Sequence, residues 1–511
     1  MDEPETVGFI DVGTNSVHLL VVEFHNDSMG TPIYQDKEVV RLGESLYSDG
    51  RLDKAAIDKC SLVVSKFSQM SRGLGASKVY AYGTCACREA DNRNELLEAI
   101  RKEGLDVRVI PGLEEARLIS LGVFGPTGPR ERTLEIDIGG GSTEIILRQG
   151  EENLFLDSLD MGAVRYSYGL GVDTTVPVSD RDYDALRRHV DLASFRAVRA
   201  VRDLGFDRAV GSSGTMINLA EMCAARRGGD SSYFTHDELV KLMSEILPMT
   251  SQQRADIPKI NRNRVDIIVA GGAIAEELMH LFGIERIEIS ERGLKQGMHI
   301  EYLLRRGYTN FDVKESSVRG LANRCQYDRG HAERVRELSL ALFDGMRELG
   351  LHRMGDDLRG LLGYAALLHD IGEFISYTKH HVHSYTIILN SYMLGFDYRE
   401  LRAMALMAKF HHKKFPNRYD RLFRDLEEAE TDDILRCAMI LKTANVMDRH
   451  RNGAVKEIRL SVSLGDLVVE IVPQEGTDVS MEIWRLGAMS EEFSAVFELC
   501  LSPVLEVGRS F

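Results

Sequence analysis

The sequence predicts an α/β protein in which two duplicated lobes are followed by an all-α domain and a small α/β appendage. Two glycine-rich strand–turn–strand segments, at residues 8–24 and 133–147, are built on the same pattern. Strands alternate with helices up to about residue 305, which is typical of an α/β sheet. From residue 318 onward the apolar residues take helical spacing, which predicts a separate helical domain.

The two glycine-rich segments predict hairpins with an unusual tip. Residues 134–138 alternate between apolar and polar side chains, which is the period-two pattern of a half-buried strand. Three glycines at 139–141 then break the strand before a second apolar run. In each segment an aspartate, Asp11 or Asp137, stands two residues before a glycine, and a hydroxyl residue follows. Glycine lets a ligand approach the backbone closely, and the N–H groups of such a tip can form a concave anion site.

Neither hairpin matches a common nucleotide-binding loop. No Gly-Lys-Ser/Thr follows either tip, which excludes a Walker-type phosphate loop. A strand and not a helix follows the glycines, which excludes the dinucleotide fingerprint. One such hairpin is most simply a tight turn, but two matched copies indicate a shared ligand site.

The other elements are predicted in chain order from periodicity and turn residues. In the first lobe we expect strands at 33–43, 78–82 and 107–110, and helices at 53–70, 95–102 and 114–123. After a linker at 125–129, the second lobe should hold helices at 179–204 and 215–225 and strands at 208–210, 265–272 and 286–290. Helices should follow at 332–349, 357–370, 385–394, 398–411 and 491–499, with a hairpin at 456–463 and 467–472. The predicted domains are 1–124, 125–305, 306–455 and 456–511.

The paired hairpins resemble the two phosphate loops of the actin, Hsp70 and sugar-kinase superfamily, which implies lobes of ribonuclease H-like fold. Further stretches at residues 111–118, 158–165, 211–215 and 290–297 narrow the resemblance. Together, residues 5–305 resemble the exopolyphosphatase/guanosine pentaphosphate phosphatase (Ppx/GppA) family. This implies hydrolysis of the terminal phosphoanhydride of inorganic polyphosphate, with guanosine pentaphosphate (pppGpp) as the alternative substrate at the same site.

Two other functions stay open. A sugar or acetate kinase of the same fold would transfer phosphate from ATP to an acceptor, and the Glu-Glu-Ala-Arg stretch at 114–117 argues against it. A non-catalytic module that senses nucleotide or polyphosphate would use the lobes as a clamp. Such a module would bind its ligand tightly without releasing phosphate.

Hydrolysis of a phosphoanhydride requires a held phosphoryl group, neutralised charge and an aligned water molecule. Asp137 and Glu144 are the best candidates to hold Mg²⁺ or Mn²⁺, with Asp11 a weaker third, because magnesium takes few carboxylates plus water and substrate oxygens. The resemblance places the catalytic glutamate at Glu115. Residues expected to bind substrate are Gly13, Thr14, Asn15, Ser16, Gly139, Gly140, Gly141 and Ser142 on the tips, Arg88 and Arg165 after turns, and Gly214. The stretch 211–215 and the pair Gly271–Gly272 either contact a nucleoside or form turns only.

A second group of residues lies in the helical part. His331, the pair His369-Asp370 and Asp448 follow the order of the HD phosphohydrolase superfamily, which this domain resembles. Such residues can share one divalent metal ion. The residues that could add a second ion are His381, His383, His411 and His412. The alternative is a degenerate helical scaffold that keeps the motif without turnover.

The 511-residue chain is acidic, with a net charge of −16. Acidity does not indicate a nucleic-acid partner, so a polyanion needs a local basic patch. The basic stretch 409–424 is either a patch of this kind, which would guide a polyphosphate chain, or a solvated surface. No run of about 18 apolar residues occurs, so no membrane insertion is expected. The acidic N-terminus and seven scattered cysteines predict a reducing cytoplasm, and the resemblance implies a homodimer.

Overall fold

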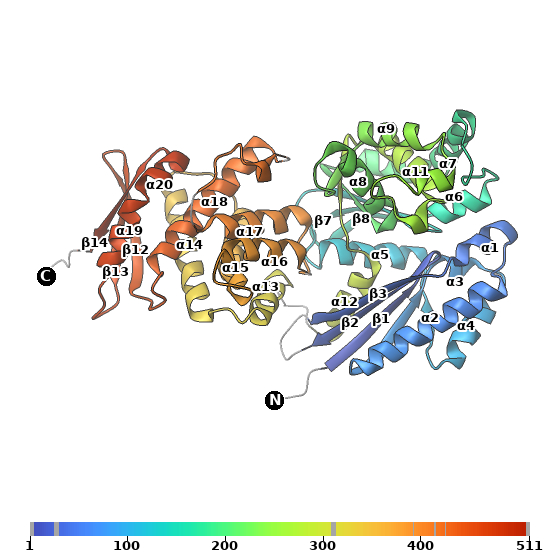
Figure 1. Ribbon diagram of the computed structural model, residues 1–511, viewed down its shortest axis with the longest axis horizontal. Coiled ribbons are helices and arrows are strands. Elements are labelled where there is room, and N and C mark those ends of the chain that lie inside the picture. The colour runs from blue at the N-terminus through green and yellow to red at the C-terminus, as the bar shows by residue number, and fades with distance from the viewer. Residues whose placement is uncertain are drawn as a thin grey trace. The chain divides into compact units, whose positions relative to one another are not determined.

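The computed structural model of the chain describes residues 5–24, 30–307, 313–391, 393–412, 415–424 and 426–506. The chain forms two compact units, residues 1–313 and 314–511 (Figure 1). The first unit contains both predicted lobes, and the second contains the helices and the appendage. The finer divisions predicted at residues 124 and 455 stay predictions.

The first lobe is built on a five-stranded sheet in the order β3-β2-β1-β4-β5. Its strands are β1 (Glu5–Val12), β2 (Ser16–Phe24), β3 (Thr31–Val39), β4 (Ala76–Gly83) and β5 (Val107–Val109). Its helices are α1 (Leu42–Asp49), α2 (Lys54–Gly73), α3 (Cys85–Glu89) and α4 (Arg93–Lys102), and α5 (Gly112–Phe124) follows. The central strand β1 is buried on both faces, as its continuous apolar run predicts.

The second lobe is built on a six-stranded sheet in the order β10-β11-β9-β6-β7-β8. Its strands are β6 (Thr133–Ile138), β7 (Thr143–Gln149), β8 (Glu152–Leu159), β9 (Arg208–Ser212), β10 (Tyr233–Thr235) and β11 (Arg286–Ile289). Its helices are α6 (Ala163–Gly169), α7 (Asp180–Leu204), α8 (Ser213–Arg227), α9 (His236–Ile246), α10 (Ser251–Arg254), the 3₁₀ turn η1 (Arg262–Arg264) and α11 (Ile268–Phe282), and α12 (Leu294–Arg305) follows.

The topology confirms the predicted duplication. In each lobe three antiparallel strands come first, β1-β2-β3 or β6-β7-β8. In each lobe later strands then add in parallel beside the first one, β4 and β5 beside β1 or β9 and β11 beside β6. Both glycine-rich segments are therefore first hairpins of equivalent sheets, which brings equivalent residues to equivalent strand ends.

Two helices connect the lobes by crossing over. The helix α5 follows the first lobe in the chain but packs on β7 and β8 of the second. The helix α12 follows the second lobe but packs on β1 and β2 of the first, and α5 and α12 pack on each other. Figure 1 shows α5 between the two sheets. The two lobes thus share a pair of helices.

The contact between α5 and α12 depends on glycine. A Cβ atom on Gly297 would overlap the backbone carbonyl of Leu118, and one on Gly122 would overlap that of Gly293. A side chain at either position would push the two backbones apart. Backbone atoms cannot move aside as the end of a flexible side chain can, so both positions require glycine.

We expect Gly297→Ala to destabilise the protein by about 1–3 kcal/mol, the usual cost of overpacking a close contact. Thermal unfolding followed by circular dichroism measures the effect as a lower Tm. Gly73→Ala is the control, because no atom lies within 4 Å of its added Cβ and its φ is not positive. Removing that glycine's chain freedom should leave stability unchanged or raise it. Equal Tm values for the two variants would show that α5 and α12 can separate freely.

One predicted strand, residues 265–272, is wrong. Residues 268–282 form the helix α11 instead, and Ile268 to Leu278 are all buried. A short, continuous apolar run does not distinguish a buried strand from a buried helix. The paired glycines lie inside this helix, where Gly271 packs on Thr215 and Gly272 on Met243. They serve close helix packing and are not a turn.

The second unit begins with a layer of helices. They are α13 (Val313–Arg324), α14 (Arg329–Glu348), α15 (Asp356–Leu368), the 3₁₀ turn η2 (Ile371–Phe374), α16 (His380–Asn390), α17 (Tyr398–Phe410), the 3₁₀ turn η3 (Arg421–Phe423) and α18 (Glu428–Met447). A three-stranded sheet follows with β12 (Val455–Ser463), β13 (Asp466–Pro473) and β14 (Cys500–Leu505), and with helices α19 (Ser480–Ala488) and α20 (Ser490–Phe497).

Among the helices and strands of this unit, α13, α18, α19 and β14 were not predicted from the sequence. Helix α18 is buried around most of its middle, residues 434–445, so it has no polar face to reveal the helical period. Strand β14 joins the predicted hairpin by pairing in parallel with β13. That pairing is a contact between distant segments and leaves no local pattern.

The basic stretch 409–424, the cysteines and the apolar character of the helices bear on the predicted partners and location. Within the basic stretch, the Lys409 ammonium lies 4.7 Å from the centre of the Tyr385 ring, and Arg418 pairs with Asp432 at 3.1 Å. Lys413 and Lys414 lie outside the described residues. All seven cysteines are free thiols. Among the described helices, none combines the length and apolar character needed to span a bilayer.

Candidate active site

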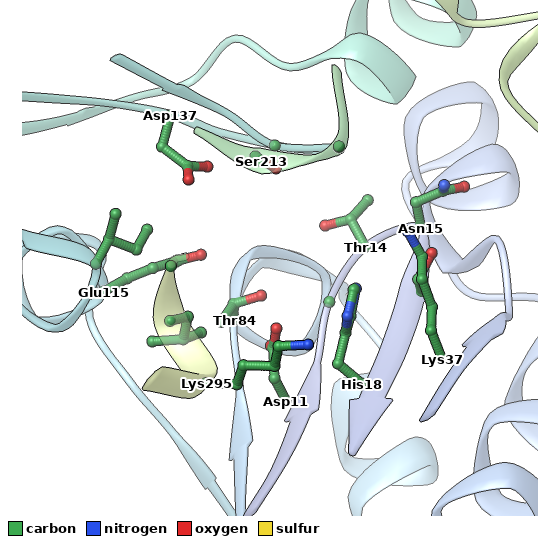
Figure 2. A pocket seen from close by; sticks show the side chains of 18 of the residues that line it. Asp11, Thr14, Asn15, His18, Lys37, Thr84, Glu115, Asp137, Ser213 and Lys295 are labelled. Atoms are coloured by element: carbon green, nitrogen blue, oxygen red, sulfur yellow. The ribbon is translucent and has the colours of Figure 1, made fainter. Parts of the chain in front are cut away.

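A cavity of about 570 Å³ lies between the two lobes (Figure 2). Figure 2 shows Asp11 and Thr14 from the first lobe, Asp137 from the second, and Glu115 from α5 around this space. The predicted site residues that line it are Asp11, Gly13, Thr14, Asn15, Ser16, Glu115, Asp137, Gly139, Gly140, Gly141, Ser142, Glu144 and Gly214. Folding thus brings residues from four separate stretches to one place.

The two hairpin tips have the same turn geometry. Gly13 N–H donates to the Ser16 carbonyl and Gly139 N–H donates to the Ser142 carbonyl, each at 3.0 Å. These two amides are among the predicted phosphate donors, but each is used inside its own turn. The predicted backbone donors that remain are those of Thr14, Asn15, Gly140, Gly141 and Ser142.

The carbonyl groups of the tips are held away from the cavity. The Thr14 carbonyl accepts from Gly43 N–H at 3.0 Å, at the start of α1. The Gly140 carbonyl accepts from Val164 N–H at 2.9 Å, at the start of α6. A carbonyl oxygen repels an anion, so this arrangement leaves the positive ends of the peptide dipoles for an anionic ligand.

Three polar atoms at the first tip lack a partner. Asp11 Oδ1, Thr14 Oγ1 and Ser16 Oγ are buried, and none has a hydrogen-bond partner among the described residues. Buried polar atoms are nearly always hydrogen-bonded. A carboxylate and two hydroxyl oxygens fit a hard cation and the oxygens of a bound phosphate. The residues present therefore suit the predicted Mg²⁺ or Mn²⁺.

Strand register explains why the predicted carboxylates face one another. Asp137 of β6 is paired with Glu144 of β7 and with Ser212 of β9, so the three side chains share one face of the sheet. Ser158 donates to Glu144 Oε1 at 2.8 Å. In the first lobe Asp11 takes the same place, and its partner across the hairpin is His18. One lobe therefore presents two acids where the other presents an acid and an imidazole.

Burial among like charges shifts these carboxyl groups. Desolvation raises the pKa of Asp11 to about 7, and the nearby Asp137 adds to the shift. Burial also raises the pKa of Asp137, and it raises the pKa of Glu144 well above its ordinary value with help from Glu115. A bound cation would favour the ionised forms of all of these groups. Without a cation between them, the negative charges of these buried carboxyl groups are poorly compensated.

Two serines of the stretch 211–215, which was predicted either to contact a nucleoside or to form a turn only, hold Asp137. Ser212 donates to Asp137 Oδ2 at 2.6 Å, and its Oγ also lies 3.2 Å from Glu135 Oε1. Ser213 also bonds the Asp137 carboxyl and lines the cavity. Its φ of 73° is in the left-handed region, which costs a non-glycine residue about 1–2 kcal/mol. This strain at the start of α8 aims the Ser213 side chain into the site.

Glu115 lies in the first turn of α5 and is buried at the cavity wall. Its Oε2 lies 3.4 Å from Arg88 Nη1, which also donates to the Ile110 carbonyl at 2.9 Å. Burial raises the pKa of Glu115 to about 8, and Arg88 opposes the rise. A carboxyl group with a pKa near neutrality can accept a proton from water. Arg88, predicted to bind substrate, does not line the cavity and orients Glu115 from behind.

The other predicted arginine is also behind the wall. Arg165 donates to the Gly141 carbonyl at 2.7 Å and to Glu89 at 2.6 Å, and its guanidinium stacks on the Tyr47 ring at 4.6 Å. It does not line the cavity. It joins the second tip to helices of the first lobe. Gly271 and Gly272 do not line the cavity either, which agrees with their place inside α11.

Several cations of the site were not predicted from the sequence. Lys37 from β3, Arg264 from η1 and Lys295 from α12 line the cavity, and so do His18 and Arg292. Burial and the nearby Arg264 lower the pKa of Lys37 to about 8. Three cations in mutual range repel one another, so the site favours a ligand with several negative charges. Lys295 and Arg292 lie in the stretch 290–297, but the sequence does not show that they meet Lys37 and Arg264, because these residues come from segments far apart in the chain.

The second predicted group is assembled in the C-terminal unit. The Asp370 carboxylate lies against the rings of His331 and His369. Asp448 bonds His331 Nδ1 at 2.8 Å, on the ring nitrogen that does not face Asp370. His411 also faces Asp370, as does His380, which the sequence analysis did not name. His383 is in none of the clusters of metal-ligating atoms found among the described residues.

Known proteins match both units. The profile of the Ppx/GppA phosphatase family matches residues 20–306, and that of Ppx/GppA phosphatase domain III matches residues 313–473. The guanosine-5'-triphosphate,3'-diphosphate pyrophosphatase of Aeromonas hydrophila is 31% identical over 406 residues, which cover 78% of this chain and 79% of that protein. Exopolyphosphatase 1 of Mycobacterium tuberculosis is 32% identical over 304 residues, which cover 58% and 88%.

Solved structures agree with the fold. The crystal structure of an exopolyphosphatase from Cytophaga hutchinsonii has a TM-score of 0.54 at 27% identity and covers 59% of this chain and 98% of its own. The Aquifex aeolicus member of the Ppx/GppA family has a TM-score of 0.50 at 23% identity, which shows the fold alone. With one family profile over more than half of its length and a second over the following domain, the chain belongs to the Ppx/GppA phosphatase family.

Proposed function

We propose that the protein is an exopolyphosphatase that releases orthophosphate from the end of inorganic polyphosphate with Mg²⁺ or Mn²⁺. The observation that carries the proposal is the cavity between two matched hairpin tips, which combines anion-binding amides with carboxylates and cations. The amides suit a terminal phosphoryl group, and the cations suit the phosphates behind it. The relatives named exopolyphosphatase support this assignment.

Each group then has a defined role. The amides of Thr14, Gly140 and Gly141 hold the terminal phosphoryl oxygens, with the hydroxyl groups of Thr14 and Ser142 beside them. Glu115 orients a water molecule and takes its proton. Lys295 and Lys37 offset the charge of the phosphate that leaves.

Asp11, Asp137 and Glu144 would hold the divalent cation, whose positive charge neutralises the phosphoryl oxygens when it is bound. Ser212 and Ser213 keep Asp137 directed toward the cavity. Ser158 does the same for Glu144. These hydrogen bonds fix the carboxylates before substrate arrives, which lowers the cost of ordering them during the reaction.

We expect stability to depend on pH and Mg²⁺ together. Folding raises the pKa of Asp11 to about 7 and that of Glu115 to about 8, so between about pH 4 and 8 the folded protein keeps protons that the unfolded chain has already lost. The contribution of these groups to the free energy of unfolding is fully present at low pH and is lost as the pH rises through their folded pKa values. Mg²⁺ binds the ionised carboxylates and should therefore raise Tm more at pH 8 than at about pH 5.5.

Differential scanning fluorimetry at the two pH values, with and without Mg²⁺, measures this coupling. The Asp137→Asn variant serves as the comparison, because it removes one proposed ligand and should lose most of the extra gain at pH 8. An Mg²⁺ shift that is the same at both pH values, or the same in the variant, would contradict a carboxylate-held cation in the cleft.

Hydrolysis of pppGpp is the second candidate, and one observation favours it. The Aeromonas hydrophila relative, matched over 406 residues, is named a guanosine-5'-triphosphate,3'-diphosphate pyrophosphatase. Phosphate release from long polyphosphate and from pppGpp should be compared at equal concentrations of terminal phosphate. We expect the higher kcat/KM with polyphosphate. A higher value with pppGpp would reassign the substrate while keeping the site, and tight binding of both without release would indicate a sensing module.

The proposal also includes a cytoplasmic homodimer, as the family resemblance implies. Multi-angle light scattering of the full chain measures its mass in solution. The basic stretch 409–424 keeps its predicted role as a guide for distant phosphates. Neutralising Arg418 together with Lys413 and Lys414 should weaken binding of long chains and make its salt dependence shallower.

A further inference from the structure

Four side chains from the two lobes form a closed ring of polar contacts. Arg41 and Glu44 belong to the first lobe, at the start of α1, and Tyr168 and Asp266 belong to the second. Arg41 Nη1 lies 2.8 Å from Asp266 Oδ2 and 2.5 Å from Glu44 Oε1. The Tyr168 hydroxyl donates to Asp266 Oδ2 at 2.9 Å and lies 3.3 Å from Glu44 Oε1. Two of these contacts therefore cross from one lobe to the other.

The backbone around Arg41 joins this ring to the first hairpin tip. The Asn15 carbonyl accepts from Val40 N–H at 2.9 Å and from Arg41 N–H at 3.0 Å. The φ of Arg41 is 57°, in the left-handed region that strains a residue other than glycine. Such strain persists where several contacts hold the backbone. A displacement of Arg41 therefore also displaces the first tip.

The helix α6 joins the ring to the second tip. At its start, Ala163 N–H donates to the Gly139 carbonyl at 3.0 Å. Val164 N–H donates to the Gly140 carbonyl at 2.9 Å. Tyr168 lies one turn beyond Val164, and the hydrogen bonds of the helix keep the two residues in a fixed relation. The ring thus connects the two tips across the lobes.

The tips themselves approach each other through glycine. A Cβ atom on Gly140 would lie 3.2 Å from Thr14 Cβ and 3.4 Å from Asn15 Cβ. Beside the tips, burial raises the pKa of Asp11, and repulsion from the nearby Asp137 adds to the rise. This repulsion favours separated tips while no cation is bound. An attraction elsewhere between the lobes is needed to keep the tips at their spacing.

We propose that the ring, which we call the latch, sets the distance between the two tips. Its members are the positioning residues Arg41, Glu44, Tyr168 and Asp266. Beside the latch, α1 and α6 pack on each other (Figure 1). None of the four residues lines the cavity, so they act through the tips and not on the substrate. The inference rests on the proposed function, because it supplies the spacing at which both sets of amides reach one terminal phosphoryl group.

A second link between the lobes provides the competing interpretation. Arg165 donates to Glu89 of α3 at 2.6 Å and to the Gly141 carbonyl of the second tip at 2.7 Å. If this link alone fixed the tips, the latch would be an ordinary surface ion pair, and such pairs contribute little. The Asp266 side chain is only 12% exposed, however, so water and salt screen its two contacts in the latch less.

Titration with long-chain polyphosphate in the presence of Mg²⁺ separates the two interpretations. A loosened latch lowers the fraction of molecules whose tips are correctly spaced, and a bound phosphoryl group restores the spacing. KM should therefore rise about 2–10-fold in Tyr168→Phe and in Arg41→Gln, with kcat unchanged. The double variant breaks both contacts between the lobes and should show the largest rise. An unchanged KM, or a lower kcat at an unchanged KM as expected from loss of folded protein, would overturn the latch.

The matched controls remove equivalent groups within one lobe. Tyr183→Phe deletes a hydroxyl that donates to Glu276 at 2.7 Å, and Arg187→Gln deletes a guanidinium that donates to Glu277 at 2.7 Å. All of these residues lie on α7 and α11 of the second lobe. The control variants should have a lower Tm but keep the wild-type KM. An equal rise of KM in the controls would show a general loosening of the lobe and overturn the latch.

Amide hydrogen exchange of the full chain without substrate gives a readout that does not depend on activity. The latch variants should exchange about 2–10-fold faster than the wild type in α1 and α6, while α5 and α12 keep their protection. If exchange changes in this way but neither polyphosphate nor pppGpp is hydrolysed, the latch stands as a link between the tips and the proposed function falls. If exchange in α1 and α6 equals that of the controls, the latch is overturned whatever the activity.

Discussion

Replacing Glu115 by glutamine should reduce phosphate release by about 10²–10⁴-fold while polyphosphate still binds. The amide keeps the shape of the side chain but cannot accept a proton from water. Steady-state release of orthophosphate measures the loss in kcat, and calorimetric titration with polyphosphate measures binding. A variant that hydrolyses polyphosphate within a few-fold of the wild-type rate would remove Glu115 from the reaction.

The chain offers a matched control in the neighbouring residue. Glu114 is bonded to Arg117 at 2.8 Å and does not line the cavity, so Glu114→Gln should keep its activity. The pH profile adds a second readout. Because the Glu115 pKa is raised to about 8, wild-type kcat/KM should rise with pH toward that value as the carboxyl loses its proton. The Glu115→Gln variant should lack this rise, and a retained rise would point to another base.

The Asp137→Asn variant should need more Mg²⁺ for half-maximal activity, by about tenfold or more. The substitution removes a negative ligand, and losing one contact to a charged group costs about 1.5–3 kcal/mol. An Mg²⁺ titration of the rate at fixed polyphosphate measures the shift. Ser212 and Ser213 bond the Asp137 carboxyl, and their hydroxyl groups can equally donate to an asparagine oxygen, so we expect the side chain to stay in place. An unchanged titration would mean that Asp137 serves the fold only.

Glu135 provides the control for this experiment. It lies two residues before Asp137 on the same face of β6, is fully buried, shares Ser212 as a partner and does not line the cavity. Burial and the nearby Asp137 raise the pKa of Glu135 well above its ordinary value, which favours its neutral form. Glutamine reproduces that neutral form, and Glu135→Gln should leave the Mg²⁺ requirement unchanged. An equal shift in both variants would indicate a general loss of packing.

The duplicated hairpins, their glycine tips and the aspartates at their ends follow from the sequence alone. Strand alternation and the backbone freedom of glycine are properties of a few consecutive residues, so they are visible without a structure. The repetition of one pattern in both lobes then predicts that the lobes are duplicated, and the structure confirms equivalent first hairpins in the two sheets. The glutamate on α5 required the family resemblance, since a single acidic residue at a helix start is otherwise only a favourable dipole contact.

Only the tertiary structure shows which side chains face these residues across the cavity. Lys37, Arg264 and Lys295 meet at the cavity from three distant segments, and Arg88 and Arg165 turn to the wall behind it. The apolar run at 268–282 forms the helix α11, which was not predicted from the sequence. Burial on all sides removes the polar face that would reveal the helical period. The contact between His380 and Asp370 was not predicted either. It depends on how the helices pack, and packing leaves no local signal in the residues that make the contact.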